Sequence, residues 1–334
     1  MIYFITLLLI AFLSYLLTWL MIRVSTRFGI YDFPSERKIH KSETPILGGL
    51  AIILAFFIGE LFILGVTHAS SSFPILMMLS YLPVFAISLY DDLREVNVYV
   101  RLTIQVLSCL IIAFVGPRIE YIPLPVGGRL YLGGFSIVIT ALWYLVIMNG
   151  FNFIDGLDGL AAGLAVIAAA NIFVTKTIIG DSLSALLCVG IGAAALGFLR
   201  FNFHPARIFM GDTGANFLGF TLAAVSLLGQ GRTVAFTSLL LPLGVLSLPI
   251  FDVIHRVARR TSERKALFLS DKDHIHHRLL EMGFGHVWVV VEFYLLTAIF
   301  GGAGLFLLTK SRLYVYIFAV LFLFFSVIWL KNKR

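Results

Sequence analysis

The sequence predicts an all-α polytopic membrane protein with about eleven transmembrane helices, and three observations lead to this fold class. Hydrophobic residues make up 60% of the 334 residues and charged residues only 13%, a balance far from that of an ordinary soluble domain. Apolar runs of roughly 16 to 22 residues recur along the chain, each long enough to span a bilayer as a tilted helix. Basic residues gather in alternate connections between these runs.

The positions of the apolar runs define the predicted elements. The first run has no basic residue before Arg23 and no small-residue cleavage site, so we interpret it as a retained anchor and not as a signal peptide. The connection at 118–130, which contains prolines and two adjacent glycines, is predicted to form a turn or a small hairpin. No repeat or linker divides the chain, which predicts a single membrane-embedded domain over 1–334. The predicted helices lie near 3–22, 46–66, 74–90, 102–117, 131–149, 160–179, 184–199, 214–229, 235–251, 287–308 and 313–330.

The distribution of charge predicts the orientation. Nineteen of the 25 Lys and Arg residues lie in one set of alternate connections, and short basic connections stay on the cytoplasmic side of a membrane. This predicts an external amino terminus, a cytoplasmic carboxyl terminus and an external hairpin. The candidate aspartates, and every histidine except His68, fall on the predicted cytoplasmic side, although they played no part in the assignment. The predicted catalytic loops on that side are 23–45, 91–101, 150–158, 200–213 and 252–286.

Aspartates stand at the ends of two apolar runs. Asp91 and Asp92 follow the third run, where adjacent carboxylates repel each other and favour a cation or a basic partner. Asn152, Asp155 and Asp158 follow the fifth run at spacings of three, so a helical path would place them on one face that lines a cavity. Carboxylates at the ends of apolar helices are costly without a function. The alternatives are a helix-terminal loop and a solvated turn.

The motif Gly211-Asp212-Thr213-Gly214 directly precedes the eighth apolar run. Thr213 or Asp212 would cap the free amides of the helix that begins there. Alternatively, these amides would face a phosphate, with Asp212 holding a divalent ion beside it. An all-oxygen set of Asp and Asn ligands favours magnesium or manganese over zinc.

Two basic segments lie on the same predicted side. The segment 252–286 carries His274, His276 and His277 after a group of arginines that includes Arg264, and such donors would bind a diphosphate or a sugar. A zinc site is an alternative, but no Cys or HExxH pattern accompanies the histidines. A loop lying on anionic lipid is another. Lys41, before the second run, would reach an anion or simply follow the topology rule.

The motifs DD, NxxNFxDGxDG, FNxxPARxFMGDTG and HIHH occur in this order on alternate connections. Together they resemble the polyprenyl-phosphate N-acetylhexosamine-1-phosphate transferase family, over residues from about 32 to 286. Within it the chain is similar to the bacterial enzymes that transfer N-acetylglucosamine-1-phosphate to undecaprenyl phosphate, at the start of O-antigen, enterobacterial common antigen or wall teichoic acid synthesis. The HIHH form differs from the three consecutive histidines of the muramoyl-pentapeptide branch.

The resemblance implies a role for each matching residue. Asp212 matches the magnesium ligand, and Asn152 the asparagine that joins it; Mn²⁺ is the alternative ion. Asp91 matches the residue proposed to receive the proton of the lipid phosphate, with Asp92 and Asp155 in the surrounding acidic site. The remaining matches concern substrate binding: Arg101 for a phosphate-binding lysine, Phe209 for the aromatic that stacks on uracil, Asn202 and Asp158 for the nucleoside pocket, and His274, His276 and His277 for the diphosphate or sugar.

The implied reaction is the direct attack of undecaprenyl phosphate on the sugar-proximal phosphorus of UDP-N-acetylglucosamine, with UMP as the leaving group. A two-step route through a phosphorylated aspartate stays open. So do another UDP-sugar, UDP-N-acetylgalactosamine or UDP-N-acetylmuramoyl-pentapeptide, and, from a different class, a lipid or ion transporter. The resemblance also implies the bacterial cytoplasmic membrane, a homodimer suggested by relatives, and no nucleic-acid partner.

Overall fold

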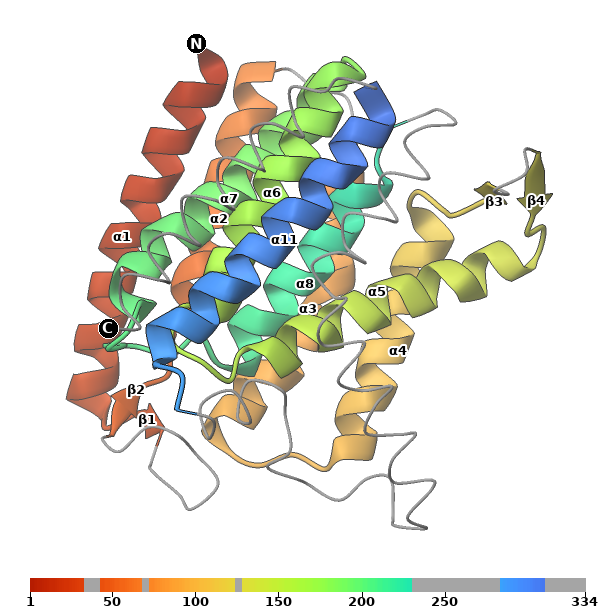
Figure 1. Ribbon diagram of the computed structural model, residues 1–334. Coiled ribbons are helices and arrows are strands. Elements are labelled where there is room, and N and C mark those ends of the chain that lie inside the picture. The colour runs from red at the N-terminus through yellow and green to blue at the C-terminus, as the bar shows by residue number, and fades with distance from the viewer. Residues whose placement is uncertain (33–42, 68–71, 124–127, 230–282, 310–334) are drawn as a thin grey trace.

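The structure, a computed structural model, describes residues 1–32, 43–67, 72–123, 128–229 and 283–309 (Figure 1). Of the helices in these ranges, eight are long and apolar enough to cross a membrane. The prediction of an all-α polytopic membrane protein is therefore confirmed. The helices predicted at 235–251 and 313–330 lie outside the described residues, and so do the five candidate binding residues Lys41, Arg264, His274, His276 and His277.

Each apolar run that falls within the described residues forms a helix, and most of these helices extend beyond the apolar run. The third run continues to Leu93 and the fifth to Ile154, so the polar motifs Asp91-Asp92 and Asn152 lie on the last turns of spanning helices. The helices are α1 (Ile2–Phe28), α2 (Gly48–Thr67), α3 (Phe73–Leu93), α4 (Val98–Val115), α5 (Phe135–Ile154), α6 (Leu160–Ile178), α7 (Ser182–Asn202), α8 (Gly211–Leu227) and α11 (His286–Thr309).

Helix α8 lies at the centre of the helix bundle. It packs against α5, α3, α2, α6 and α7, and its side chains from Thr213 to Ser226 are buried. Two glycines permit the closest approaches. A Cβ atom at Gly219 would lie 2.6 Å from the backbone of Met148 on α5, and one at Gly49 would lie 2.4 Å from the amide nitrogen of Gly214. The centre of the fold thus holds the first turn of α8 in a fixed position.

The outermost helix, α1, presents large apolar side chains away from the bundle. Phe4, Leu8 and Phe12 are more than half exposed, whereas the buried residues of α1 are mostly Thr and Ser. The hydroxyl group of Ser14, for example, donates a hydrogen bond to the carbonyl oxygen of Ala194 on α7. In a membrane the apolar face meets lipid tails, and helix contacts depend on small and polar residues.

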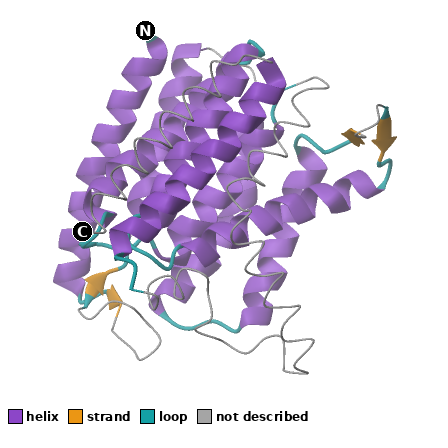
Figure 2. Cartoon of the chain, viewed as in Figure 1, coloured by secondary structure: helices purple, strands orange, loops and turns teal. Residues whose placement is uncertain are grey.

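Two short antiparallel hairpins complete the described part of the chain (Figure 2). Strands β3 (Tyr121–Pro123) and β4 (Arg129–Tyr131) confirm the hairpin predicted near 118–130. Strands β1 (Tyr31–Asp32) and β2 (Thr44–Pro45) form a pair that was not predicted from the sequence. Strand β2 leads directly into α2, and the carbonyl oxygen of Pro45 accepts a hydrogen bond from the amide of Phe209. This contact joins the start of α2 to the segment before α8.

Candidate active site

Polar residues from four helices meet at one end of the bundle. Asp91 and Asp92 lie at the end of α3, Arg101 in the first turn of α4, Asn152 in the last turn of α5, and Asp212 in the first turn of α8. The sequence motifs that contain them are up to about 120 residues apart, yet the packing of α8 against α3 and α5 brings them together. The structure therefore groups these predicted site residues into one cluster, which we call the acidic cluster.

Arg101 links two carboxylates of the acidic cluster. Its Nη1 atom lies 2.5 Å from Oδ2 of Asp91 and 2.6 Å from Oδ2 of Asp212. The other oxygen of Asp91 accepts a hydrogen bond of 2.8 Å from the amide of Val96. Asn97 caps α4 through a side-chain bond to the amide of Tyr99, and so fixes the turn that carries Arg101. A single positive charge thus lies between two carboxylates.

Asp92 caps the first turn of α8 from a neighbouring helix. Its Oδ1 atom accepts a hydrogen bond from the amide of Asp212 at 2.7 Å. Its Oδ2 atom accepts two, from the amide of Thr213 at 3.1 Å and from the Thr213 hydroxyl at 2.5 Å. Gly211 has a φ of 66° and a Cβ there would lie 2.6 Å from the carboxylate, so this position requires glycine.

The contact with Asp92 differs from both predictions for the backbone amides at the start of α8. The sequence suggested either a cap from Thr213 or Asp212, or amides directed at a phosphate. Instead the amides of Asp212 and Thr213 both donate to Asp92, a carboxylate at the positive end of the helix. We conclude that Asp92 positions Asp212, because both of its oxygens are engaged in holding the backbone there.

Asn152 and Asp155 complete the acidic cluster. The side-chain amide of Asn152 lies within hydrogen-bonding reach of Asp212. Burial raises the pKa of the Asp155 carboxyl group well above its usual range, and the charges of Asp212, Asp92 and Asp158, in that order, raise the pKa further. Several carboxylates therefore share this region with one guanidinium group, an arrangement that favours the binding of another cation.

The expectation that Asn152, Asp155 and Asp158 share one helical face is wrong. Helix α5 ends at Ile154, and the next residues form a turn that ends at Gly159, whose φ is 79°. Asp155 stays within the acidic cluster, whereas Asp158 makes its contacts with a different loop. The glycines of the motif break the helix, and the break separates the two aspartates into neighbouring sites.

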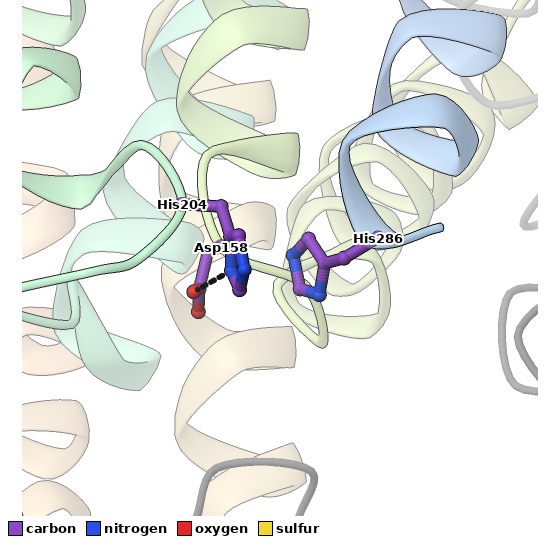
Figure 3. A group of neighbouring side chains, drawn as sticks. All are labelled: Asp158, His204 and His286. Atoms are coloured by element: carbon purple, nitrogen blue, oxygen red, sulfur yellow. Dashed lines mark hydrogen bonds and ion pairs between the residues drawn. The ribbon is translucent and has the colours of Figure 1, made fainter. Parts of the chain in front are cut away.

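Asp158 belongs to a second group of side chains, drawn in Figure 3. Its Oδ2 atom lies 2.8 Å from Nδ1 of His204 and accepts a hydrogen bond of 3.1 Å from the amide of Ala206. The ring of His204 stacks on that of His286, with centroids 4.3 Å apart and an angle of 20° between the planes. Neither histidine is among the site residues predicted from the sequence. His204 lies inside the FNxxPARxFMGDTG motif, which was a usable signal, but no pattern marks His286.

Asp158, His204 and His286 place ligand atoms within 4.8 Å of one another, but their present geometry does not suit a metal ion. A metal lies in the plane of each imidazole that binds it, along the lone pair of the nitrogen. Because the two rings are stacked nearly parallel, their lone pairs do not converge on one point. We therefore describe this group as a hydrogen-bonded and stacked cluster.

Asn202 and Phe209 hold the loop that joins α7 to α8. The side chain of Asn202 accepts a hydrogen bond from the amide of Gly159 at 3.1 Å and donates one to the carbonyl of Ile208 at 2.9 Å. The carbonyl of Phe209 accepts a hydrogen bond from the amide of Gly48, and its side chain is half-buried. Asn202, predicted for the nucleoside pocket, and Phe209, predicted to stack on uracil, thus both lie on the segment that leads to Asp212.

Comparison with known proteins gives consistent matches. Residues 74–230 match the family model described as glycosyl transferase family 4. The chain is 35% identical over 326 residues to a probable undecaprenyl-phosphate N-acetylglucosaminyl 1-phosphate transferase of Bacillus subtilis, covering 96% of this chain and 90% of that protein. It is 33% identical over 325 residues to a decaprenyl-phosphate N-acetylglucosaminephosphotransferase of Mycobacterium tuberculosis, covering 88% and 80%. An undecaprenyl-phosphate alpha-N-acetylglucosaminyl 1-phosphate transferase of Escherichia coli is 28% identical over 288 residues, covering 78% and 72%.

Proposed function

The chain belongs to glycosyl transferase family 4, and from this premise we propose that it transfers N-acetylglucosamine-1-phosphate from UDP-N-acetylglucosamine to undecaprenyl phosphate and releases UMP. The relatives named for this reaction support the proposal. The observation that carries the proposal is the acidic cluster. There the carboxylates of Asp91 and Asp212 both contact the guanidinium group of Arg101, at the ends of apolar helices. A site for charged phosphates beside a lipid phase is what this reaction requires.

The acidic cluster fits a divalent metal ion. Asp212, Asp91 and Asn152 offer oxygen atoms, which magnesium and manganese prefer over the nitrogen and sulfur ligands typical of zinc. The guanidinium group of Arg101 lies between two of these carboxylates, and this supports the proposal that a cation binds there. Asp212 and Asn152 would hold Mg²⁺, or Mn²⁺ in its place. A bound ion would neutralise the diphosphate and withdraw charge from the phosphorus under attack.

The residues of the acidic cluster are proposed to orient the lipid phosphate toward the sugar-proximal phosphate of UDP-N-acetylglucosamine. An oxygen of the lipid phosphate forms a bond to the sugar-proximal phosphorus, the bond from that phosphorus to the bridging oxygen breaks, and UMP leaves with the electron pair. The bond between C1 of the sugar and its oxygen is not broken. A phosphate monoester has a second pKa of about 6 and is mostly a dianion near pH 7. Asp91 is therefore proposed to contribute mainly by orienting the acceptor, and a strong base is not required.

The second group of side chains supports a place for the nucleoside. Asp158 accepts a hydrogen bond from the amide of Ala206, which lies in the same loop as Phe209. Phe209 is three residues before Asp212. A nucleotide held by its base near Phe209 and Asp158 would present its diphosphate to the acidic cluster. In this arrangement the short segment from Phe209 to Asp212 provides both the contact with the base and the metal ligand.

The apolar surface of the helices supports a lipid acceptor. Burial of a prenyl chain in lipid is favourable by about 0.8 kcal/mol for each CH₂ group, so the acceptor stays in the bilayer while the nucleotide sugar arrives from water. The basic residues favour the cytoplasmic side for the acidic cluster. We place the reaction at the cytoplasmic face of the bacterial cytoplasmic membrane.

Purified protein in lipid nanodiscs is expected to release UMP only when UDP-N-acetylglucosamine, undecaprenyl phosphate and Mg²⁺ are all present. Chelation with EDTA should reduce release to background, and added Mg²⁺ or Mn²⁺ should restore it, because the acidic cluster needs a divalent ion. The measurement is UMP formed per enzyme with time. Turnover that survives complete chelation would contradict the metal assignment.

The same assay distinguishes the remaining alternatives. Equal amounts of UDP-N-acetylglucosamine, UDP-N-acetylgalactosamine and UDP-N-acetylmuramoyl-pentapeptide in competition should give mainly the first product. Stoichiometric UMP release without lipid acceptor, together with labelled protein, would support the two-step route. Transport of a lipid or an ion without any UMP release would support a transporter.

Replacement of Phe209 by alanine is expected to raise the KM for UDP-N-acetylglucosamine about tenfold or more with a smaller change in kcat, because stacking on a base contributes about 1–3 kcal/mol. Phe135→Ala, which removes an exposed aromatic ring from the opposite end of α5, is the matched control and should leave KM within about twofold. Steady-state kinetics on both variants provides the test. A Phe209 variant with unchanged KM would remove the base-stacking role.

A further inference from the structure

We propose that Arg101 is an exchangeable counter-ion: its guanidinium group pairs with Asp91 and Asp212 before substrate binds, and leaves them when a divalent cation and the nucleotide diphosphate bind together. This inference rests on the proposed function and deepens it. It assigns to Arg101 a coupling between the binding of the metal and the binding of the nucleotide.

Because of these contacts, Arg101 and a metal ion cannot both lie beside Asp91 and Asp212 at the same time. One nitrogen atom, Nη1, makes both short contacts, at 2.5 Å to Asp91 and 2.6 Å to Asp212. A cation bound to Asp212 at this point would lie within a few ångströms of the guanidinium group, and two positive charges at that range repel strongly. The metal ion and Arg101 therefore compete for the same carboxylate oxygen.

Arg101 is the movable member of this group. Asp91 is held by the amide of Val96, and the backbone of Asp212 is held by Asp92. The side chain of Arg101 is 28% exposed, about as much as that of Asp212 at 30%, but it is the longest of the three and extends from the first turn of α4. The carboxylate of Asp91 and the backbone of Asp212 are thus held in place, whereas the long side chain of Arg101 is able to turn toward a new partner.

The nucleotide diphosphate supplies that partner. A guanidinium group binds phosphate oxygens with short, charge-assisted hydrogen bonds. When a diphosphate is present, Arg101 loses two carboxylates but gains phosphate oxygens, and the carboxylates are released to the metal. Metal alone must displace Arg101 without this compensation. The divalent cation should therefore bind weakly alone and more tightly when the nucleotide is bound. By linkage, the cation should raise the affinity for the nucleotide by the same factor.

The test is a titration of purified protein in nanodiscs with Mn²⁺, followed by the EPR signal of free Mn²⁺, with and without saturating UDP and with correction for Mn²⁺ bound to UDP in solution. Arg101→Gln is expected to bind Mn²⁺ alone about tenfold more tightly than the unaltered protein. The gain in Mn²⁺ affinity that UDP produces should fall from about tenfold to about twofold in this variant. Arg101→Lys, which keeps a competing charge, should bind Mn²⁺ alone no more than about threefold more tightly.

Arg94→Gln is the matched control. Arg94 is exposed, lies in the connection between α3 and α4, and carries the same charge, so its loss should leave both affinities within about twofold. Equal or weaker Mn²⁺ binding by Arg101→Gln in the absence of UDP would overturn the exchange, and so would an equal gain in Arg94→Gln. If the unaltered protein binds no Mn²⁺ even with UDP, the metal assignment itself fails, which is a different outcome.

Discussion

Replacement of Asp212 by asparagine is expected to lower kcat by about 10³-fold, which corresponds to roughly 4 kcal/mol of lost transition-state stabilisation. Asp212 is the proposed metal ligand, lies in the first turn of the central helix, and contacts Arg101 and Asn152. The variant keeps the size of the side chain, and the amide that donates to Asp92 belongs to the backbone. The fold should therefore persist while Mn²⁺ affinity falls.

Turnover, thermal unfolding and Mn²⁺ affinity are the measurements for the Asp212 variant. Glu95→Gln is its matched control, because Glu95 is an exposed carboxylate in the connection between α3, which carries Asp91 and Asp92, and α4, which carries Arg101. The control should retain turnover within about twofold. Near-normal turnover by Asp212→Asn would contradict the proposed metal role, and loss of activity accompanied by unfolding would be recognised in the thermal scan.

Replacement of Asp92 by asparagine is expected to reduce kcat by about ten- to a hundredfold and to lower the melting temperature. Asp92 accepts three hydrogen bonds from Asp212 and Thr213, and hydrogen bonds to a charged group contribute about 1.5–3 kcal/mol. An asparagine has one acceptor oxygen and would direct an NH₂ group at an amide donor. The first turn of α8 would loosen, and Asp212 would move out of position.

Thr213→Val is the graded control for this prediction. It removes only the hydroxyl donor at 2.5 Å and leaves both backbone donors to Asp92, so we expect a loss of about tenfold or less in kcat. Both variants should weaken Mn²⁺ binding, which distinguishes a positioning role from general destabilisation. If Asp92→Asn abolished turnover with unchanged melting temperature and unchanged Mn²⁺ affinity, Asp92 would act on the reacting groups directly.

The sequence predicts the helices well because the bilayer imposes a simple rule on them. Every spanning helix needs a long apolar run, and such runs are visible without any tertiary information. The ends of the helices were less predictable. Asp91, Asp92 and Asn152 are polar, yet they continue α3 and α5 because their backbone groups remain paired within the helix. The β1–β2 pair is only two residues long on each side and has no pattern of its own.

Parts of the candidate site depend on tertiary contacts that no local pattern reports. The motifs identified Asp91, Asp155 and Asp212, and the helix packing brings them together. The cap from Asp92 to α8 joins residues 120 positions apart, whereas the local sequence predicts a cap only from Asp212 or Thr213. The stacking of His286 on His204 likewise forms only when α11 packs beside α6.

The central claim is that a divalent cation at Asp212 holds the nucleotide diphosphate in the acidic cluster. It is tested most directly by pulsed electron-nuclear double resonance on the protein with Mn²⁺ and UDP-N-acetylglucosamine, in the absence of lipid acceptor. We expect a strong ³¹P coupling, the sign of phosphate bound directly to the ion, and its loss in Asp212→Ala. An equally strong coupling in Asp212→Ala, at unchanged Mn²⁺ affinity, would show that Asp212 does not hold the ion.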